Sequence, residues 1–157
     1  MSFKGRLYAK TMDILLGRGL GDQIRFGMSM SQIEQLLGKP DKIIPLDEED
    51  ERVEHHYNQL KTVFRYYDKD GVKLGWIETE NPQIELFGVK AMGLEKSGAI
   101  NLLSTQGHDS LEFDDYGSFE TLFFEECWLE LQLTFDRVSR VKFGVFIDEN
   151  DEYCWPI

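Results

Sequence analysis

The stretch Gly71–Glu78 has the sequence GVKLGWIE, and the stretch Arg140–Ile147 has the sequence RVKFGVFI. Both place Val-Lys before a large apolar residue, which is followed by a glycine and further apolar residues. Aligning Val72 with Val141 gives two predicted strands with the same pattern of residues. The similarity predicts that the chain contains the same structural unit twice.

Segments upstream of both strands extend the match. GMSMSQIEQLLGKPD starts at Gly27 and GLEKSGAINLLSTQGHD starts at Gly93, and both contain a Leu-Leu pair. Apolar residues at helical spacing predict a short helix in each segment. In the first segment Ser29 can cap the helix, and Gly38 and Pro40 end it.

Two hairpins are expected after these helices. TVFRYYD and VKLGWIE flank an Asp-Gly pair, which is a strong signal for a short turn. In the second half CWLELQLTFD alternates between polar and apolar residues, and RVKFGVFID follows after a turn expected near Val138 and Ser139. The side expected to face the core carries Leu129, Leu131, Leu133 and Phe135.

These elements predict an α+β fold. Two related helix-plus-antiparallel-strand repeats, at about 22–80 and 88–148, are expected to form a sheet with helices on one face. Leucines and a methionine at helical spacing predict an N-terminal helix over about 5–17. The length of 157 residues fits one domain, 1–157. The three tryptophans are expected in the core or between the repeats: Trp76, Trp128 and Trp155.

The first repeat opens with a Gly-Met-Ser segment and closes its helix with Leu-Leu-Gly-x-Pro-Asp. This opening resembles the small repeat shared by β-lactamase inhibitor proteins and by the lipoproteins of the outer-membrane assembly machinery. The matching residues are Gly27, Met28, Ser29, Ile33, Leu36, Leu37, Gly38, Pro40 and Asp41. The second repeat departs from it, with Ser104, Gln106 and Gly107 at the helix exit. The resemblance implies the repeat fold and a tendency to bind proteins. In size and acidity the chain also resembles bacterial toxin-immunity proteins.

The formal net charge of −12 bears on the kind of partner. A negative field repels phosphate backbones and anionic membranes, so neither nucleic acid nor membrane is an expected partner. A basic protein partner fits better, although acidity alone also keeps a protein soluble. The N-terminal stretch has no apolar signal-peptide core, which predicts a cytoplasmic protein. Cys127 and Cys154 are accordingly expected to be buried and reduced.

Two residue groups have a metal-binding alternative. His55 and His56 are adjacent, but neighbouring side chains of a strand point to opposite faces, so a surface or half-buried pair is favoured over a shared metal. Asp68 and Asp70 suggest a calcium loop, but its other ligands are missing and a hairpin explains them. No metal and no cofactor is expected.

The sequence also contains one candidate pair of nucleophile and base. Cys127 and His108 have suitable chemistry, but nothing in the sequence places them together, and core packing of Cys127 is favoured. We therefore expect no catalytic residue. The function expected is an acidic protein-binding module, immunity-like, that inhibits a basic partner. The alternative is a small-molecule-binding or enzymatic domain with a pocket between the two repeats.

Two acidic stretches are the candidate partner-binding residues. The first lies between helix and hairpin of repeat one, and the second, with aromatic residues, lies in the same place of repeat two. Aromatic residues beside carboxylates make a good contact patch for a basic partner. A solvated loop is the alternative for the first stretch. The candidate residues are Asp47, Glu48, Glu49, Asp50, Asp114, Asp115, Tyr116 and Phe119.

Overall fold

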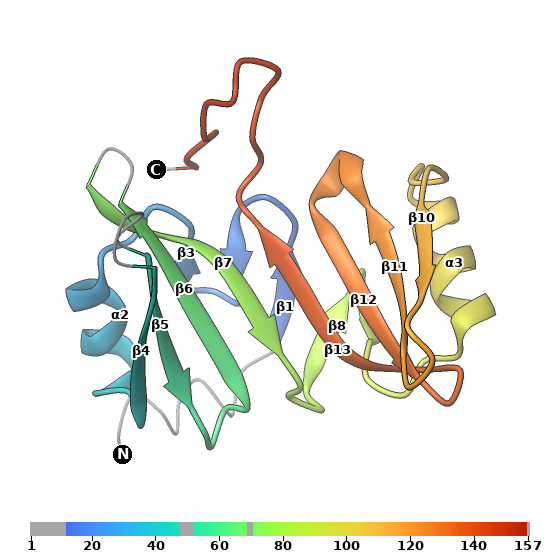
Figure 1. Ribbon diagram of the computed structural model, residues 1–157, viewed down its shortest axis with the longest axis horizontal. Coiled ribbons are helices and arrows are strands. Elements are labelled where there is room, and N and C mark those ends of the chain that lie inside the picture. The colour runs from blue at the N-terminus through green and yellow to red at the C-terminus, as the bar shows by residue number, and fades with distance from the viewer. Residues whose placement is uncertain (1–11, 48–51, 69–70, 157) are drawn as a thin grey trace.

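A computed structural model of the chain describes residues 12–47, 52–68 and 71–156. An eight-stranded antiparallel sheet dominates it (Figure 1). The strand order is β10-β11-β12-β13-β7-β6-β5-β4. The strands are β4 (Lys42–Asp47), β5 (Arg52–Tyr57), β6 (Thr62–Asp68), β7 (Val72–Thr79), β10 (Glu112–Asp115), β11 (Glu120–Phe124), β12 (Leu129–Thr134) and β13 (Arg137–Gly144).

A second, smaller sheet has the order β3-β2-β1-β8-β9. Its strands are short, and β1 and β8 are parallel while its other neighbours are antiparallel. It packs against the large sheet, where Phe26 after β3 meets Phe143 of β13 edge to face at 5.9 Å. The strands are β1 (Met12–Leu15), β2 (Gly19–Leu20), β3 (Ile24–Arg25), β8 (Ile84–Leu86) and β9 (Val89–Lys90).

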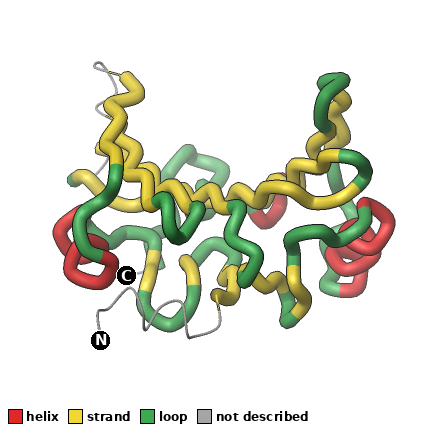
Figure 2. The backbone as a smooth tube through the Cα atoms, turned by 90° about the horizontal axis from the view of Figure 1, so that it is seen from below, coloured by secondary structure: helices red, strands yellow, loops and turns green. Residues whose placement is uncertain are grey.

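Two α-helices lie within the described residues, α2 (Met30–Leu37) and α3 (Lys96–Thr105). As expected, Ser29 caps α2: its hydroxyl accepts a hydrogen bond from the Gln32 backbone N–H, and the Gln32 side chain accepts one from the Ser29 N–H. Gly38 ends this helix with a φ of 82°. The helices lie at the two ends of the large sheet, and the small sheet lies between them (Figures 1 and 2).

The expected fold class is wrong. The chain is 47% strand and 15% helical, and a second sheet, rather than helices, covers the middle of the inner face. The quoted strands are β7 and β13, which are neighbours at the centre of the sheet, where Phe143 pairs with Ile77. Val72 and Val141 do not hold equivalent places, because Val72 pairs with Asp68 near a hairpin end whereas Val141 lies mid-sheet.

Three other predictions concern the bounds of the two repeats, the N-terminal helix and the buried leucines of β12. Residues 22–80 hold β3, α2 and β4–β7, and residues 88–148 hold β9, α3 and β10–β13. The helix expected over 5–17 is wrong where the structure describes it, because Met12–Leu15 is a strand; residues 5–11 lie outside the described part. The inward-facing leucines of β12 are confirmed as buried.

The large sheet is strongly curved. Figure 2 shows both of its ends rising to the side away from the helices and the small sheet. Its inner face holds the core, with Phe64, Ile77 and Leu131 almost fully buried. Its outer face carries polar and aromatic side chains instead. This outer face and the ends of its hairpins are open to solvent.

Candidate binding surfaces

The predicted residues of the second acidic stretch come together at one hairpin. Asp114 and Asp115 end β10 and are exposed, and Tyr116 is 61% exposed. The rings of Tyr116 and Phe119 stack with centroids 5.0 Å apart. The Tyr116 N–H donates to the Phe119 carbonyl at 2.9 Å, and the Gly117 N–H donates to an Asp115 carboxylate oxygen at 2.9 Å. The hairpin therefore presents a pre-formed aromatic pair beside two carboxylates.

A further exposed aromatic residue, Phe135, lies at the same end of the sheet. Its side chain is 96% exposed, and the expectation that it faces the core is wrong. Phe135 and Asp136 have φ values of 51° and 65° and form the turn between β12 and β13, rather than Val138 and Ser139. A left-handed φ is unfavourable for a bulky residue. The signal that sequence reasoning missed is a two-residue gap between two alternating strands.

The two turns are neighbours because β11 lies between them. Glu120 of β11 pairs with Asp115 on one side and with Leu133 on the other, so both turns leave the sheet at its lower end in Figure 1. Two strand spacings correspond to roughly 10 Å. We call this region the hairpin-end surface; it consists of Asp114, Asp115, Tyr116, Phe119, Phe135 and Asp136.

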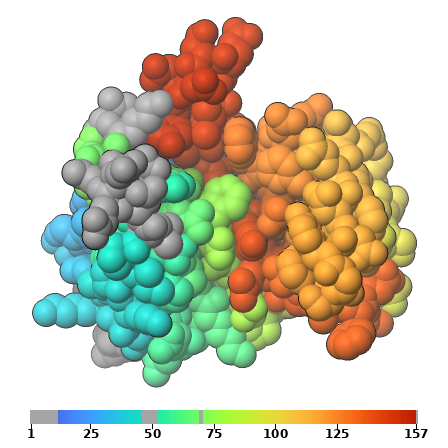
Figure 3. Space-filling model, viewed as in Figure 1, coloured from blue at the N-terminus to red at the C-terminus, as the bar shows by residue number. Residues whose placement is uncertain are grey.

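The first predicted acidic stretch lies elsewhere. Asp47 ends β4, which is the opposite edge of the large sheet from β10. Residues 48–50, with the candidates Glu48, Glu49 and Asp50, lie outside the described residues. The two stretches do not lie together, because the width of the sheet separates β4, which ends at Asp47, from β10, which ends at Asp115 (Figure 3).

Ion pairs cross the outer face from strand to strand. One Glu54 carboxylate oxygen accepts hydrogen bonds from Nε and Nη2 of Arg65 at 3.1 and 2.7 Å, and a Glu78 oxygen lies 3.5 Å from the same Nη2. Burial by itself raises the pKa of the Glu54 carboxyl, but hydrogen bonds from Arg65 and His56 outweigh burial and lower the pKa. Lys142 of β13 is the register partner of Glu78, and its ammonium group lies 3.3 Å from a Glu130 oxygen. The charges of these outer-face side chains therefore largely cancel, and their ion pairs link neighbouring strands.

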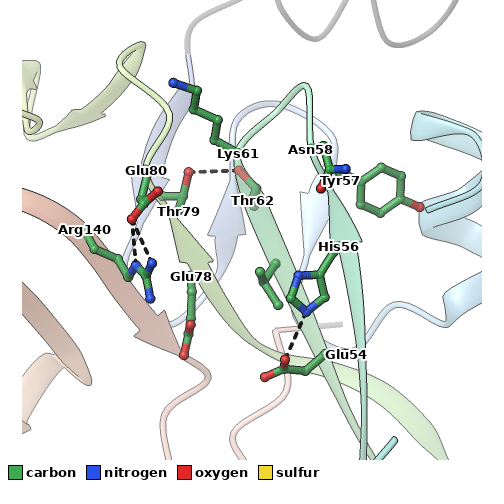
Figure 4. A pocket seen from close by; sticks show the side chains of 11 residues that line it. Glu54, His56, Tyr57, Asn58, Lys61, Thr62, Glu78, Thr79, Glu80 and Arg140 are labelled. Carbon is green, nitrogen blue, oxygen red and sulfur yellow. Dashed lines mark hydrogen bonds and ion pairs between the residues drawn. The ribbon is translucent and has the colours of Figure 1, made fainter. Parts of the chain in front are cut away.

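A polar cleft of about 520 Å³ opens beside these ion pairs (Figure 4). His56 Nε2 lies 3.2 Å from Glu54, and Thr62 and Thr79 share a hydrogen bond of 2.8 Å. Across the cleft, Glu80 accepts two hydrogen bonds from Arg140, at 3.1 and 2.7 Å. These ionisable groups are already paired, so the cleft offers recognition of polar groups rather than a poised acid or base.

Aromatic rings lie flat on the centre of the outer face. A Cβ at Gly75 would stand 2.5 Å from the Tyr67 ring, and a Cβ at Gly144 would stand 2.4 Å from the Trp76 ring. Both rings line a pocket of about 270 Å³ together with Trp128. Trp76 and Trp128 therefore line an outer-face pocket rather than the core, and Trp76 of the first half contacts Gly144 of the second. Trp128 has a left-handed backbone, with a φ of 48°.

A larger, mainly apolar pocket of about 730 Å³ lies on another part of the molecule, between β1, the β8–β9 turn and the 3₁₀ helix Glu125–Cys127. Cys127 and His108 both line it, which sequence reasoning could not show. Burial raises the pKa of the Cys127 thiol to about 11. The thiol stays protonated at neutral pH and is unsuited to act as a nucleophile. Cys154 is exposed rather than buried, and the two cysteines are not paired.

The two adjacent histidines point to opposite sides of β5, as the strand geometry predicts. His55 is buried, with its ring 5.0 Å from that of Tyr66, and His56 lies on the outer face. Burial lowers the pKa of His55. No group of three or more His, Cys, Asp or Glu residues in the described part of the chain is arranged to hold a metal ion. Asp70 lies outside the described residues.

Comparisons with known proteins place the chain near no family. A scan against protein-family models finds no match, and a search of curated proteins finds none either. Among solved structures, an extracellular protein containing a SCP domain from Bacillus anthracis str. Ames is similar, with a TM-score of 0.46 and 13% sequence identity. The match covers 76% of this chain and 43% of that chain. This likeness is too weak to bear on function.

Among the described residues, none of the helices is both long and apolar enough to cross a bilayer.

Proposed function

We propose that this protein is a binding module for a basic partner protein, and that the partner docks on the hairpin-end surface. The observation that carries the proposal is Phe135, a phenylalanine 96% exposed at a left-handed turn position. Exposing the Phe135 ring to water is unfavourable, and so is a left-handed backbone at a bulky residue. Strained positions and exposed aromatic residues are concentrated where proteins bind.

The neighbours of Phe135 support docking of a protein. Tyr116 and Phe119 add a stacked aromatic pair, which loses little side-chain freedom on binding because it is already ordered. Carboxylates stand next to the rings in the chain, with Asp114 and Asp115 before Tyr116 and Asp136 after Phe135. With a net charge of −12, this surface attracts a basic protein over long range. The likeness to toxin-immunity proteins makes neutralisation of such a partner the role we favour.

The test compares partner capture by matched variants. The intact protein is immobilised and exposed to extract of its source cell, and captured proteins are quantified at low and high salt. A true partner is lost on Phe135→Asn and is weakened by Asp114→Asn with Asp115→Asn. It is retained by the control Glu149→Gln, which neutralises an exposed acid in the C-terminal segment, at the end of the molecule opposite these turns in Figure 1.

Binding kinetics then separate the two contributions. Removing the carboxylates should slow association, most strongly at low salt, because the screening length shrinks from about 10 Å at 0.1 M to about 3 Å at 1 M. Losing Phe135 should mainly speed dissociation, by about 30-fold for a 2 kcal/mol hot spot. A partner whose binding is unchanged by all these substitutions would refute docking on the hairpin-end surface.

A further inference from the structure

The apolar pocket of about 730 Å³ has a different location and a different chemistry from the hairpin-end surface. Its volume falls in the range of about 300–1,000 Å³ that is usual for small-molecule sites. Ile14, Leu15 and Leu16 of the β1 region supply aliphatic walls, and Cys127 supplies a protonated thiol. The pocket is thus large enough for a drug-sized molecule and mostly apolar.

Phe87 forms part of the pocket in an unfavourable backbone conformation. Leu86 pairs with Val89, so Phe87 and Gly88 make a two-residue hairpin turn, with φ values of 51° and 78°. Asn, Asp or Gly is preferred at such a first position, and a bulky residue is a genuine outlier. The Phe87 ring stacks on the His108 ring at 6.3 Å with an interplanar angle of 22°. The turn therefore carries a phenylalanine whose ring lines the pocket, at a position where Asn, Asp or Gly would be more stable.

A second flat wall is supplied by Phe146. A Cβ at Gly17 would stand 2.7 Å from the Phe146 ring, so the ring lies against bare backbone. Phe87, His108 and Phe146 therefore give the pocket three planar groups. Planar aromatic molecules are favoured by such surroundings, because ring pairs add to the energy of apolar burial.

The charges around the pocket are mainly negative. Asp13, Glu85 and Glu126 line it, against the single guanidinium of Arg18. Lys90 lies 3.9 Å from Glu85 and offsets that carboxylate, which leaves the two carboxylates of Asp13 and Glu126 against the one guanidinium of Arg18. His108 Nδ1 is buried with no hydrogen-bond partner among the described residues, 4.0 Å from a Glu126 oxygen. The rim accordingly suits a ligand with a positive charge.

We propose that this pocket binds a small aromatic molecule carrying an ammonium group. The ring enters between the aliphatic walls and the planar groups, and the ammonium group meets the carboxylates of Asp13 and Glu126. This site is independent of the hairpin-end surface, since no residue is shared between them. Loss of one binding activity therefore leaves the other measurable.

Three probes with one ring system and different charges test the proposal. Tryptamine, indole and indole-3-propionate are titrated into the full chain, and backbone amide resonances are followed by NMR. Tryptamine should shift the amides of Leu16, Gly88 and Cys127 saturably, with a dissociation constant on the order of 0.1–1 mM. Indole should bind more weakly, and indole-3-propionate more weakly still.

Phe87→Asn is the decisive variant because it removes the ring and suits the turn. It should fold at least as well as the wild type and bind tryptamine about tenfold more weakly. Phe135→Asn is the matched control, with the same substitution at an equivalent turn position whose φ is also 51°; its affinity for tryptamine should be unchanged. Glu126→Gln should reduce the preference for tryptamine over indole severalfold.

The proposal is overturned by any of three results. The first is no saturable shift at these three amides at several millimolar tryptamine. The second is full affinity in Phe87→Asn. The third is tighter binding of indole-3-propionate than of tryptamine.

Discussion

The ring of Trp76 in β7 lies flat on Gly144 of the neighbouring strand β13, with room for no Cβ between them. Gly75 stands in the same relation to the Tyr67 ring of β6. The glycine shared by the two similar strand sequences therefore has a steric purpose in each strand. In both cases a bare backbone lets an aromatic ring of the adjacent strand lie down on the outer face.

Replacing Gly144 should show how tight this contact is. A Cβ would stand 2.4 Å from Trp76 Cε3 and 3.1 Å from the Gly75 carbonyl oxygen, so Gly144→Ala should lower the free energy of unfolding by about 2 kcal/mol or more. Chemical denaturation measures the change. Gly98→Ala is the control: its nearest neighbour is the flexible end of Leu94, and alanine favours the α3 helix. Equal effects at both glycines would contradict this account.

Two Glu–Arg pairs have the same hydrogen-bond distances, but they should contribute differently to the free energy of unfolding because one pair is more buried. Glu54–Arg65 and Glu80–Arg140 each have hydrogen bonds of 3.1 and 2.7 Å, but their glutamate side chains are 11% and 47% exposed. Glu54→Gln should cost about 2 kcal/mol of unfolding free energy at pH 7, since it leaves a half-buried cation poorly paired. Glu80→Gln should cost at most about 0.5 kcal/mol.

Acid should remove the Glu54 contribution. Because the folded-state pKa of Glu54 is lowered, the carboxylate stabilises the fold above its unfolded pKa, and this contribution is lost as pH falls through the folded pKa. Stability curves from pH 7 to pH 3 should therefore converge for wild type and Glu54→Gln at the acid end. Curves that stay parallel would show that Glu54 is not an ionised partner of Arg65.

His55 should make the protein less stable in mild acid. Burial lowers its folded-state pKa below the usual 6.5, so between these two values the unfolded chain binds more protons and stability falls as pH falls. The slope can reach at most about 1.4 kcal/mol per pH unit. His55→Phe keeps a ring against Tyr66 and should flatten the curve of unfolding free energy between pH 7 and pH 5. His56→Asn, on the outer face, should leave the His55 slope in place.

Phe135→Asn should stabilise the protein. Asn tolerates the left-handed conformation better than Phe, and the 96% exposed ring has no packing to lose. We expect a gain of about 0.5–1 kcal/mol, measured by thermal or chemical unfolding. Phe135→Leu keeps a bulky residue at the same φ and should bring no gain. A loss of stability in Phe135→Asn would mean that the ring packs somewhere and is not free to dock.

Local signals in the sequence predicted local structure well. The cap at Ser29, the helix end at Gly38 and the hairpin of β6 and β7 were all foreseeable, because each depends on residues close in the chain. The exposure of Tyr116 was also foreseeable, because Asp114 and Asp115 directly precede it in the chain. These features need no knowledge of distant contacts.

The small sheet could not be predicted in this way. Its strands have two to four residues, too few to show a period, and β1 is paired with β8 from far along the chain. Met12 and Leu15 fit a helical spacing equally well, so the helix prediction failed there. The apolar pocket depends on the same distant pairing, which brings Leu16, Phe87 and Cys127 together.

The order of strands in the large sheet has a consequence for the speed of folding. β4 to β7 are consecutive hairpin neighbours, and so are β10 to β13, so each group can close through short loops. Among the described strands of this sheet, β7 and β13 alone join the two groups, as where Val141 pairs with Thr79. This pairing must wait for a long stretch of chain to be brought back. Each group is therefore expected to form early, and the seam between Glu78 and Lys142 to close late. Substitutions at that seam should then act mainly on the unfolding rate and leave the folding rate nearly unchanged.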